Sequence, residues 1–336
     1  MYAYNMPITA NFIVTRNCNC NCIFCGVEHK SLKKDLESDY NKIKHIIDRL
    51  DESGIFRINF FGGEPLVYPH IIKAVKYAKS KNFYTSMVSN GLALSESMCE
   101  DFKNTLDVIG ISIHGLEDTH NSLTRIPNSF KNAIKSLKLL NKYNIPVCIN
   151  MTVTKNNYTE IPQLVSLIVK EAHVTGFCFN RCIPNKCIPD STNEVLSPTT
   201  KELTESLYLI KDLDEKYTDI FFKYSIHFPY CLIKDKSLIK YIGSCGFGQN
   251  YISIDEKGNI QLCSYTNEIL GNIFEQNLKD LWNNHKELKN YRNENWLPLK
   301  CKSCIYKIKC MSGCKASSGK GYFAPDILLK EVCNNE

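Results

Sequence analysis

Clustered cysteines constrain this chain more than any other feature. Of its 17 cysteines, four fall at positions 18–25, three at 178–187 and eight after position 230. The N-terminal stretch MYAYNMPITANFIV lacks the basic region, long apolar run and cleavage site of a secretory signal, so we expect a cytoplasmic protein. A reducing compartment disfavours disulfides, and an odd number of thiols cannot pair completely. The clusters therefore predict metal or iron–sulfur ligation.

Composition and charge argue against two classes of partner. The sequence contains no apolar run of about eighteen residues, so it predicts no membrane-spanning helix. The net charge is +6, and the 41 Lys and Arg residues are spread along the chain rather than gathered. A mild, dispersed excess of this kind is typical of a solvated surface and predicts no nucleic-acid binding.

The first two thirds of the chain alternate apolar runs with amphipathic stretches. Strands are predicted at 9–15, 57–61, 84–89, 107–113, 146–153 and 174–180, and helices at 39–53, 69–81, 96–104, 129–143, 160–172 and 201–215. The strands are almost continuously apolar, as in a parallel sheet that is covered on both faces. Six βα units of this kind predict an α/β fold that forms an open, partial (β/α)6 TIM-like barrel.

Unusual short motifs follow five of the six predicted strands. They are NCNCNCIFC (17–25), FGGEP (61–65), SNG (89–91), SIHG (112–115) and NRC (180–182). The carboxyl ends of parallel strands share one edge of the sheet, and chemistry in such folds gathers there. We therefore expect the five motifs to meet at one rim of the barrel.

The pattern changes after about residue 228, where the strand–helix alternation stops and cysteine density rises. Residues 251–264 predict a β-hairpin, with Gly258 at a turn position that requires a positive φ. We predict two domains, a partial barrel over residues 1–228 and a small cysteine-rich domain over residues 229–336.

The first cysteine cluster carries a family resemblance. Cys18, Cys22 and Cys25 have the spacing C-x3-C-x2-C, which resembles the signature of radical S-adenosylmethionine (SAM) enzymes. The resemblance implies that these thiolates hold a [4Fe–4S] cluster whose open iron binds the amino and carboxylate groups of SAM. A four-thiolate zinc site is the alternative that the spacing alone leaves open. Cys20 does not fit the family spacing and is interpreted as a spare thiol.

The turn after the second strand supports this resemblance. FGGEP resembles the GGEP motif that follows the second strand in radical SAM enzymes. The resemblance implies that Gly62 and Gly63 let the backbone approach the methionine moiety of SAM. It also implies that Gly62 and Glu64 contact the amino group of SAM.

Five polar residues at the other strand ends are assigned by the same resemblance. Ser89, Asn90 and Ser112 resemble positions that contact the ribose or the carboxylate of SAM. Arg125 or Arg181 is expected to pair with that carboxylate, because a guanidinium fork suits it. A strand-end cap or a surface salt bridge is the alternative role for each of these residues.

Other rim residues are candidates for contact with the substrate. Cys182 and Cys187 follow the sixth strand, and either is a candidate hydrogen-atom donor to a substrate radical. His114 stands where many relatives have Asp, and we interpret it as a buried structural histidine, with a substrate contact as the alternative. Cys148 and Cys178 lie within apolar strands and are interpreted as packing residues.

A second cysteine pattern fills the C-terminal domain. Cys245 is followed by Gly258 and Cys263, and then come Cys301-x2-Cys304-x5-Cys310-x3-Cys314 and Cys333. Every spacing resembles that of SPASM domains, which hold two auxiliary [4Fe–4S] clusters. A zinc ribbon built from the four cysteines at 301–314 is the alternative, but it leaves the other three without a role.

The resemblance to SPASM domains implies how these thiols divide. The distal auxiliary cluster takes Cys301, Cys304, Cys310 and Cys333, and the nearer one takes Cys245, Cys263 and Cys314. The nearer cluster then needs a fourth ligand, for which Cys231 in HFPYC is favoured over an open iron. Together with the N-terminal cluster, the resemblance implies three [4Fe–4S] clusters and SAM as cofactors.

The resemblance also implies a reaction. In radical SAM enzymes, a reduced cluster splits SAM and yields a 5′-deoxyadenosyl radical, which takes one hydrogen atom from the substrate. Two further clusters offer an electron a way out, so we expect net oxidation of the substrate. By family analogy, the substrate is a ribosomally made peptide or a protein side chain, which is crosslinked or dehydrogenated.

Partners and alternatives follow from the same reasoning. We expect a reducing partner such as flavodoxin or ferredoxin and, because only 17 residues precede Cys18, a separate leader-binding protein. An alternative enzyme oxidises a sugar or aminoglycoside alcohol. An alternative of another class is a non-catalytic iron–sulfur electron carrier, which has no need of GGEP or of an open iron.

Overall fold

A ten-stranded sheet organises the molecule. The computed structural model describes residues 3–26, 30–31, 39–185, 187, 189–266, 268–318 and 323–329. The strand order of the sheet is β12-β11-β10-β1-β4-β5-β6-β7-β8-β9, and neighbouring strands from β1 to β9 in this order are parallel. The expected partial barrel is confirmed.

The six predicted barrel strands are present, each within two residues of its expected bounds. The parallel strands are β1 (Thr9–Thr15), β4 (Arg57–Gly62), β5 (Tyr84–Ser89), β6 (Val108–Ser112), β7 (Val147–Val153), β8 (Gly176–Arg181) and β9 (Phe221–Ile226). Two short strands, β2 (Asn17–Cys18) and β3 (Lys30–Ser31), form a separate parallel pair.

Strand β9 is an addition to the six expected strands. It lies at the edge of the sheet, where its exposed and buried residues alternate along FFKYSI. An edge strand with one solvated side lacks the continuous apolar run that marked the other barrel strands, so the apolar-run criterion did not select it.

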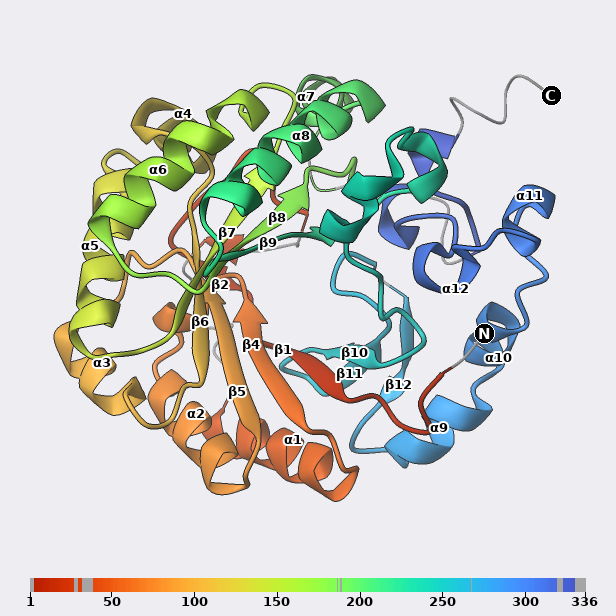
Figure 1. Ribbon diagram of the computed structural model, residues 1–336. Coiled ribbons are helices and arrows are strands. Elements are labelled where there is room, and N and C mark those ends of the chain that lie inside the picture. The colour runs from red at the N-terminus through yellow and green to blue at the C-terminus, as the bar shows by residue number, and fades with distance from the viewer. Residues whose placement is uncertain are drawn as a thin grey trace.

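Helices cover the outer side of the curved sheet (Figure 1). The predicted helices are confirmed as α1 (Tyr40–Glu52), α2 (Ile71–Ser80), α3 (Glu96–Phe102), α5 (Ser129–Lys142), α6 (Ile161–Glu171) and α8 (Thr200–Lys216). Helices α4 (Glu117–Thr124) and α7 (Asp190–Leu196) were not predicted. In α1, the Asp39 side chain caps the first turn by accepting from Asn41 N (3.1 Å), and the isoleucine and leucine stripe is fully buried against the sheet.

The cysteine-rich region continues the barrel sheet. Its strands are β10 (Tyr251–Ile254), β11 (Asn259–Gln261) and β12 (Ile269–Asn272), and its helices are α9 (Leu278–Asn284), α10 (Lys286–Arg292), α11 (Leu299–Lys302) and α12 (Lys307–Cys310). The predicted hairpin is confirmed, and Gly258 has a φ of +85° in its turn. Strand β10 pairs in parallel with β1, which joins the two predicted domains through one sheet. The boundary at residue 228 stays a prediction.

Short 3-10 helices connect several of these elements. They are η2 (Pro65–Val67), η3 (Tyr158–Glu160), η4 (Tyr230–Leu232), η5 (Lys236–Tyr241), η6 (Lys315–Ser318) and η7 (Ile327–Leu329). Segment η4 follows β9 along the chain, and η7 follows η6 at the end of the described residues.

The two faces of the barrel strands differ. Along β7, alternate residues beginning at Val147 are fully buried, while the intervening residues are only half-buried. Polar side chains occupy the inner face of neighbouring strands, where Ser86 Oγ donates to Asn59 Oδ1 (3.2 Å). Cys148 and Cys178 are also hydrogen-bonded across β7 and β8, and this bond lowers the pKa of Cys178 to about 7. The two thiols thus lie next to each other, and their packing role stays a prediction.

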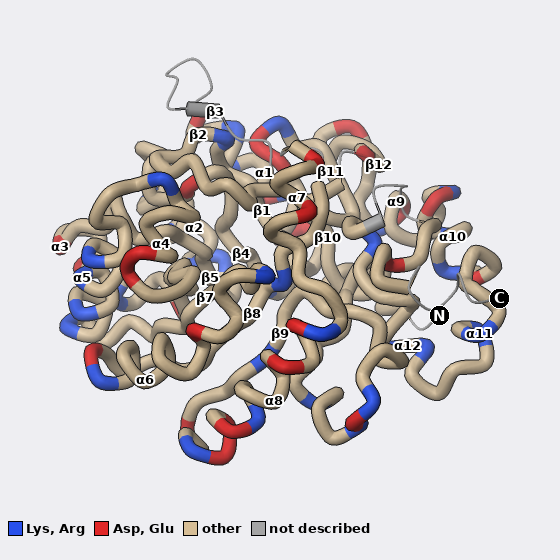
Figure 2. Tube along the Cα trace, turned by 90° about the horizontal axis from the view of Figure 1, so that it is seen from above, with Lys and Arg blue, Asp and Glu red and all other residues tan. Residues whose placement is uncertain are grey.

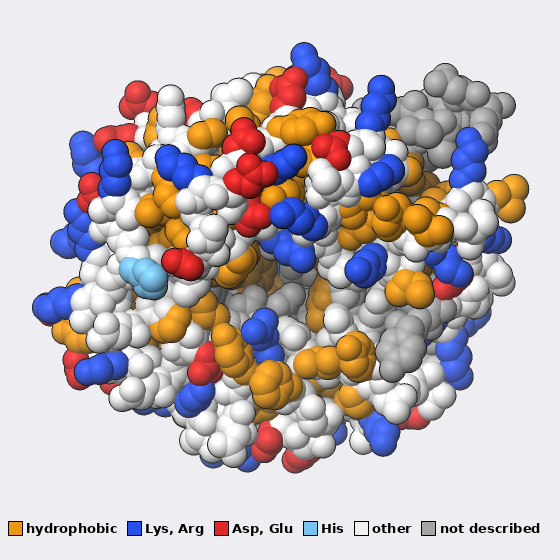
Figure 3. Space-filling model, in the orientation of Figure 1, with side chains coloured by type: hydrophobic (Ala, Val, Ile, Leu, Met, Phe, Trp, Pro, Cys, Tyr) orange, Lys and Arg blue, Asp and Glu red, His pale blue; other side chains and the backbone are white. Residues whose placement is uncertain are grey.

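The surface carries mixed charge. Lys and Arg alternate with Asp and Glu over the whole chain (Figure 2), and the same mixture surrounds a hollow near the centre of the face in Figure 3. In the part of the chain that the structure describes, no helix combines the length and the apolar character that a membrane crossing requires.

Candidate active site

A cavity lies at the carboxyl ends of the parallel strands. The five rim motifs supply Cys18, Cys20, Cys22, Phe24, Cys25, Phe61, Gly62, Gly63, Glu64, Ser89, Asn90, Ser112, His114, Asn180, Arg181 and Cys182 to its lining. The motifs therefore meet at one rim of the barrel. This is what we predicted, because the carboxyl ends of parallel strands lie at the same edge of a sheet.

The carboxylate of Glu64 holds the GGEP turn together. Its Oε1 accepts hydrogen bonds from Leu66 N (2.9 Å) and Ser89 Oγ (2.6 Å), and its Oε2 accepts one from Asn90 N (2.7 Å). Glu64 is only 2% exposed. Burial raises the pKa of Glu64, while the three hydrogen bonds oppose the rise. The cavity thus contains a carboxylate whose orientation is fixed by three donors.

Ser89 and Asn90 have a positioning role that sequence reasoning missed. Both bind Glu64, so they join the turn after β4 to the turn after β5. The Asn90 side chain also donates to Asn19 Oδ1 (2.7 Å) and to Cys20 Sγ (3.3 Å) in the first cysteine loop. Their predicted contact with SAM, and that of the cavity residue Ser112, stays a prediction.

The glycines of GGEP are required by the neighbouring strand. A Cβ on Gly62 would lie 2.5 Å from Thr15 O, and a Cβ on Gly63 would lie 2.3 Å from Asn17 O. The backbone of Gly63 also donates to Thr15 O (2.8 Å). The close approach therefore binds the turn to the start of the cysteine loop, whether or not a ligand is present.

We predict that Gly63→Ala destabilises the protein by about 1–3 kcal/mol, because the added methyl group meets backbone oxygens of the preceding loop. These oxygens cannot move without moving Cys18, so we also expect the variant to incorporate less iron. Chemical denaturation and iron analysis of anaerobically reconstituted protein measure both effects. Gly54→Ala is the control: its Cβ would meet nothing within 4 Å, and its φ of +73° costs about 1–2 kcal/mol. Equal iron content in the two variants would contradict the prediction.

The first cysteine loop is tied to α4 by backbone hydrogen bonds. Asn21 N donates to Thr124 O (3.3 Å), and Ile23 N donates to Leu123 O (3.0 Å). The hydrogen bond to Cys20 and burial both raise the pKa of Cys18. A soft, positively charged group would be needed to hold such thiols as thiolates, which suits an iron–sulfur cluster.

His114 is held in one tautomer. Its Nδ1 accepts a hydrogen bond from Thr152 N (3.1 Å), which leaves the proton of the neutral ring on Nε2. Burial lowers the pKa of His114 well below its usual value, and His120, whose ring stacks on it at 5.5 Å, lowers it further. His114 is buried and also lines the cavity, so its position is compatible with a structural role and with contact to a substrate.

The two candidate arginines are placed differently. Arg125 is exposed at the end of α4, with a φ of +57°, and is not part of the cavity lining. Arg181 lines the cavity, is 2% exposed and forms a buried ion pair with Asp326 from the C-terminal region. Within the described residues, its Nε has no hydrogen-bond partner. Arg181 is therefore the candidate that lines the cavity, and its unpaired Nε is itself buried.

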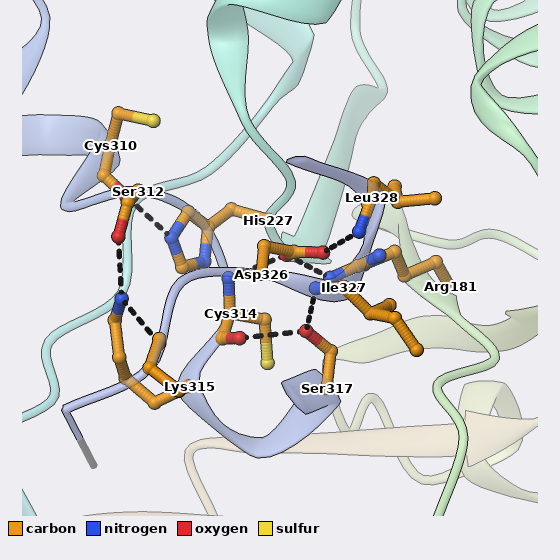
Figure 4. Close-up of polar contacts among 11 residues, drawn as sticks. Arg181, His227, Cys310, Ser312, Cys314, Lys315, Ser317, Asp326, Ile327 and Leu328 are labelled. Atoms are coloured by element: carbon orange, nitrogen blue, oxygen red, sulfur yellow. Dashed lines mark hydrogen bonds and ion pairs between the residues drawn. The ribbon is translucent and has the colours of Figure 1, made fainter. Parts of the chain in front are cut away.

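Asp326 connects the cavity to the cysteine-rich region (Figure 4). The oxygen Oδ2 that pairs with Arg181 also accepts from Cys314 N (2.8 Å), and Oδ1 accepts from Leu328 N (3.1 Å). In the same network, His227 Nε2 lies 3.0 Å from Cys310 O. A buried charge pair thus fixes the backbone of a predicted cluster ligand relative to the end of β8.

Of the two candidate hydrogen-atom donors, Cys182 lines the cavity and Cys187 does not. Cys182 is 4% exposed, and burial raises its pKa to about 12. Cys187 is exposed, with its Sγ 3.7 Å from Gly26 O. Cys182 is therefore placed as a neutral thiol in the cavity wall, whereas Cys187 lies outside next to the cysteine loop.

The SPASM-like thiols fall into two groups. The first group is Cys245, Cys263 and Cys314: the charge of Cys314 raises the pKa of Cys245 and of Cys263, and the charge of Cys245 also raises that of Cys263, each on top of a larger effect of burial. Cys301, Cys304 and Cys310 form the second group. The division of these thiols between two clusters, as the resemblance implies it, stays a prediction. Cys333 lies outside the described residues.

Cys231 lies beside the second group. Its charge raises the pKa of Cys301 and of Cys310, so its role as the fourth ligand of the nearer cluster stays a prediction that these contacts do not support. The reason for its position is the packing of η4, where Tyr230 contacts the ring of Tyr306 with centroids 5.6 Å apart. Sequence order alone placed Cys231 closer to Cys245.

Tyr265 is a cavity residue that sequence reasoning missed. Its ring covers Gly26, since a Cβ there would lie 2.7 Å from the ring. Burial and the charges of Cys25 and Cys263 raise its pKa. Tyr265 follows Cys263 by two residues, so its nearness to the SPASM pattern was the available signal. It links the first cysteine loop to the nearer thiol group.

Comparison with known proteins identifies the family. A model of the radical SAM superfamily matches residues 12–168, and a model of SPASM, an iron–sulfur cluster-binding domain, matches residues 245–305. An AdoMet-dependent heme synthase of Methanosarcina barkeri is 25% identical and spans 97% of this chain and 95% of its own. A PqqA peptide cyclase of Gluconobacter oxydans is 22% identical and spans 93% and 86%.

Solved structures share the fold. Streptococcus suis SuiB bound to S-adenosylmethionine has a TM-score of 0.78 at 18% identity, covering 96% of this chain and 76% of that one. The protein anSMEcpe with bound AdoMet has a TM-score of 0.75 at 18% identity, covering 97% and 95%. The first model covers the cavity motifs that follow β1, β4, β5 and β6, and the second covers Cys245, Cys263, Cys301 and Cys304 of the two thiol groups. The chain therefore belongs to the radical SAM superfamily and carries a C-terminal SPASM domain.

Proposed function

We propose that this protein is a radical SAM oxidoreductase that oxidatively modifies a side chain of a peptide or protein. The observation that carries the proposal is the meeting of three thiols with the family spacing, a fixed Glu64 carboxylate and the Arg181 side chain in the lining of one cavity. When bound, a reduced [4Fe–4S] cluster and SAM supply a 5′-deoxyadenosyl radical that takes one hydrogen atom from the substrate.

The cavity residues divide between holding the cofactors and holding the substrate. Cys18, Cys22 and Cys25 would bind the cluster, and Glu64 would receive the amino group of SAM, because it is a buried carboxylate that lines the same cavity. Arg181 would supply positive charge toward the carboxylate of SAM, since it lines the cavity while Asp326 fixes its guanidinium. A neutral His114 would donate from Nε2.

Two auxiliary clusters would receive the electron that oxidation releases. The group of Cys245, Cys263 and Cys314 would hold the nearer cluster, separated from the cavity by Tyr265. The group of Cys301, Cys304 and Cys310 would hold the distal cluster. With the cluster of the first loop, the protein would contain three [4Fe–4S] clusters. A reducing partner such as flavodoxin or ferredoxin would supply electrons from outside.

A peptide substrate is supported by the cavity and by relatives. Asn150, Thr152 and Asn180 add amide and hydroxyl groups to the lining, and such groups pair well with peptide N–H and C=O. Several relatives are PqqA peptide cyclases, and SuiB has been solved with its precursor peptide SuiA. A separate leader-binding protein is proposed as a further partner.

A second candidate is a reaction on a tetrapyrrole. It is favoured by one observation: the heme synthase of M. barkeri matches this chain over 95% of its own length, compared with 86% for the peptide cyclase of G. oxydans. Both candidates use the same radical chemistry and differ in what the cavity admits.

Anaerobic incubation with SAM and dithionite tests the proposal. We expect 5′-deoxyadenosine, and in the presence of the correct peptide its rate should rise while the peptide loses the mass of two hydrogen atoms. Candidate peptides encoded beside the gene, a tetrapyrrole carboxylic acid and an aminoglycoside form the three arms. Turnover of only the tetrapyrrole or the aminoglycoside would refute a peptide substrate, and absence of 5′-deoxyadenosine in all arms would indicate an electron carrier.

A further inference from the structure

The nearer SPASM thiol group contains an additional polar side chain. Tyr251 Oη lies 4.0 Å from Cys245 Sγ and shares a side-chain hydrogen bond with Cys263. Its electrostatic neighbours are Cys245, Cys263 and Cys314. The phenol oxygen of Tyr251 therefore lies next to Cys245 and Cys263, two of the three thiols that the resemblance assigns to this cluster.

The backbone keeps Tyr251 in this position. Tyr251 is the first residue of β10, where it pairs in register with Thr9 of β1. On its other side it forms a parallel bridge with Phe247, two residues after Cys245. A Cβ on Gly246 would lie 2.7 Å from the Tyr251 ring, so glycine at this position allows the ring to pass beside the Cys245 loop.

Other candidates for a fourth ligand are less well placed. Cys231 lies beside the second thiol group. Tyr291 is an electrostatic neighbour of Cys245 and Cys314, but its ring is held between Phe247 (centroids 4.9 Å) and Trp296 (5.2 Å). Among the described residues near this group, Tyr251 is the oxygen donor with hydrogen-bonding contact to a thiol of the group.

We propose that Tyr251 is the fourth ligand of the nearer auxiliary cluster and binds its remaining iron through the phenolate oxygen. The inference rests on the proposed function, because it requires that cluster to be present. On binding, the O–H bond breaks, an Fe–O bond forms and the proton leaves to solvent, with no change in oxidation state. Tyrosinate is an established protein ligand of ferric iron, and metal binding deprotonates such donors.

Phenolate ligation has a functional consequence. An open iron at this position would offer a site for a substrate thiol or carboxylate, whereas an iron closed by Tyr251 would not. The nearer cluster would then act as an electron acceptor and leave substrate binding to the cavity residues. Addition of a small thiol would accordingly change the spectrum of a Tyr251→Phe variant but not that of the parent protein.

The test uses full-length protein in which Cys18, Cys22 and Cys25 are replaced by alanine, so that only auxiliary clusters contribute to the spectra. Resonance Raman spectra excited in the visible range should show bands of iron-bound phenolate. We expect Tyr251→Phe to remove these bands and Tyr251→Cys to remove them while keeping the cluster closed to added thiol. Tyr291→Phe, a tyrosine beside the same thiols, is the matched control and should keep the bands.

The outcomes separate this inference from the proposed function. About eight irons per chain with phenolate bands that depend on Tyr251 supports the inference. About eight irons without phenolate bands, or bands that persist in Tyr251→Phe, overturns it and leaves the proposed function intact. Absence of auxiliary iron overturns both. Absence of phenolate bands from the parent protein overturns the inference even if a variant fails to fold, and bands that are lost in Tyr251→Cys as well as in Tyr251→Phe assign them to Tyr251.

Discussion

Replacing Cys22 by alanine is expected to abolish reductive cleavage of SAM. A radical SAM cluster has only three protein ligands, so loss of one leaves two, and the cluster is not retained. We expect iron content to fall by about four of about twelve irons per chain. Replacing a residue that only contacts a metal ligand lowers metal affinity or activity by up to about 100-fold. Loss of a ligand itself should lower the rate of 5′-deoxyadenosine formation by far more. Iron analysis and chromatography of the reaction mixture measure the two effects.

Cys20→Ala is the matched control within the same loop. Cys20 lines the cavity and accepts a hydrogen bond from Asn90 Nδ2 (3.3 Å), but it does not fit the family spacing. We expect its replacement to leave iron content unchanged and to lower the rate by no more than about tenfold, as for a residue beside a ligand. The opposite result, in which Cys20→Ala loses the cluster and Cys18→Ala keeps it, would show that Cys20, Cys22 and Cys25 are the ligands.

Asp326→Ala is expected to destabilise the protein by about 3–5 kcal/mol. The substitution leaves the guanidinium of Arg181, which is 2% exposed, without its ion-pair partner. It also leaves Cys314 N and Leu328 N without their acceptor. Anaerobic chemical denaturation measures the free energy of unfolding, and the iron content of the SPASM domain reports the local effect on the Cys314 segment.

Two further variants make the test specific to burial. Glu96→Ala removes a partner of Lys142 in an ion pair whose side chains are 59% and 63% exposed, and it should cost less than about 1 kcal/mol. The double substitution Arg181→Met with Asp326→Leu should recover much of the stability, because it removes both buried charges together. A cost for Asp326→Ala as small as that for Glu96→Ala would show that the buried pair does not stabilise the junction.

Local sequence patterns predicted most of the barrel. The spacing of apolar residues located six parallel strands and their helices to within two residues. A helix that is buried on one side has apolar residues at a regular spacing, and a strand that is buried on both sides is a continuous apolar run. Both patterns can be recognised in the sequence without knowing which element packs against the segment. Strand β9 was missed because an edge strand is only partly buried, and the short helices α4 and α7 are too brief to show a clear period.

The cysteine spacings were also informative because the ligands of one cluster lie close together along a loop. Cys18, Cys22 and Cys25 are separated by only a few residues, so their spacing limits how they can surround a cluster. The position of Cys231 could not be predicted in this way. It depends on how η4 packs against the loop around Tyr306, which is a contact between distant segments.

By itself, the sequence determined the parallel sheet, the rim at which its motifs meet and the family to which its cysteine spacings belong. Only the tertiary structure decided that Ser89 and Asn90 hold Glu64, that Arg181 pairs with Asp326 from 145 residues away, and that Tyr251 lies next to two thiols. The physical reason is that periodicity and spacing report interactions along the chain, whereas buried ion pairs and hydrogen bonds depend on which strand ends the fold brings together.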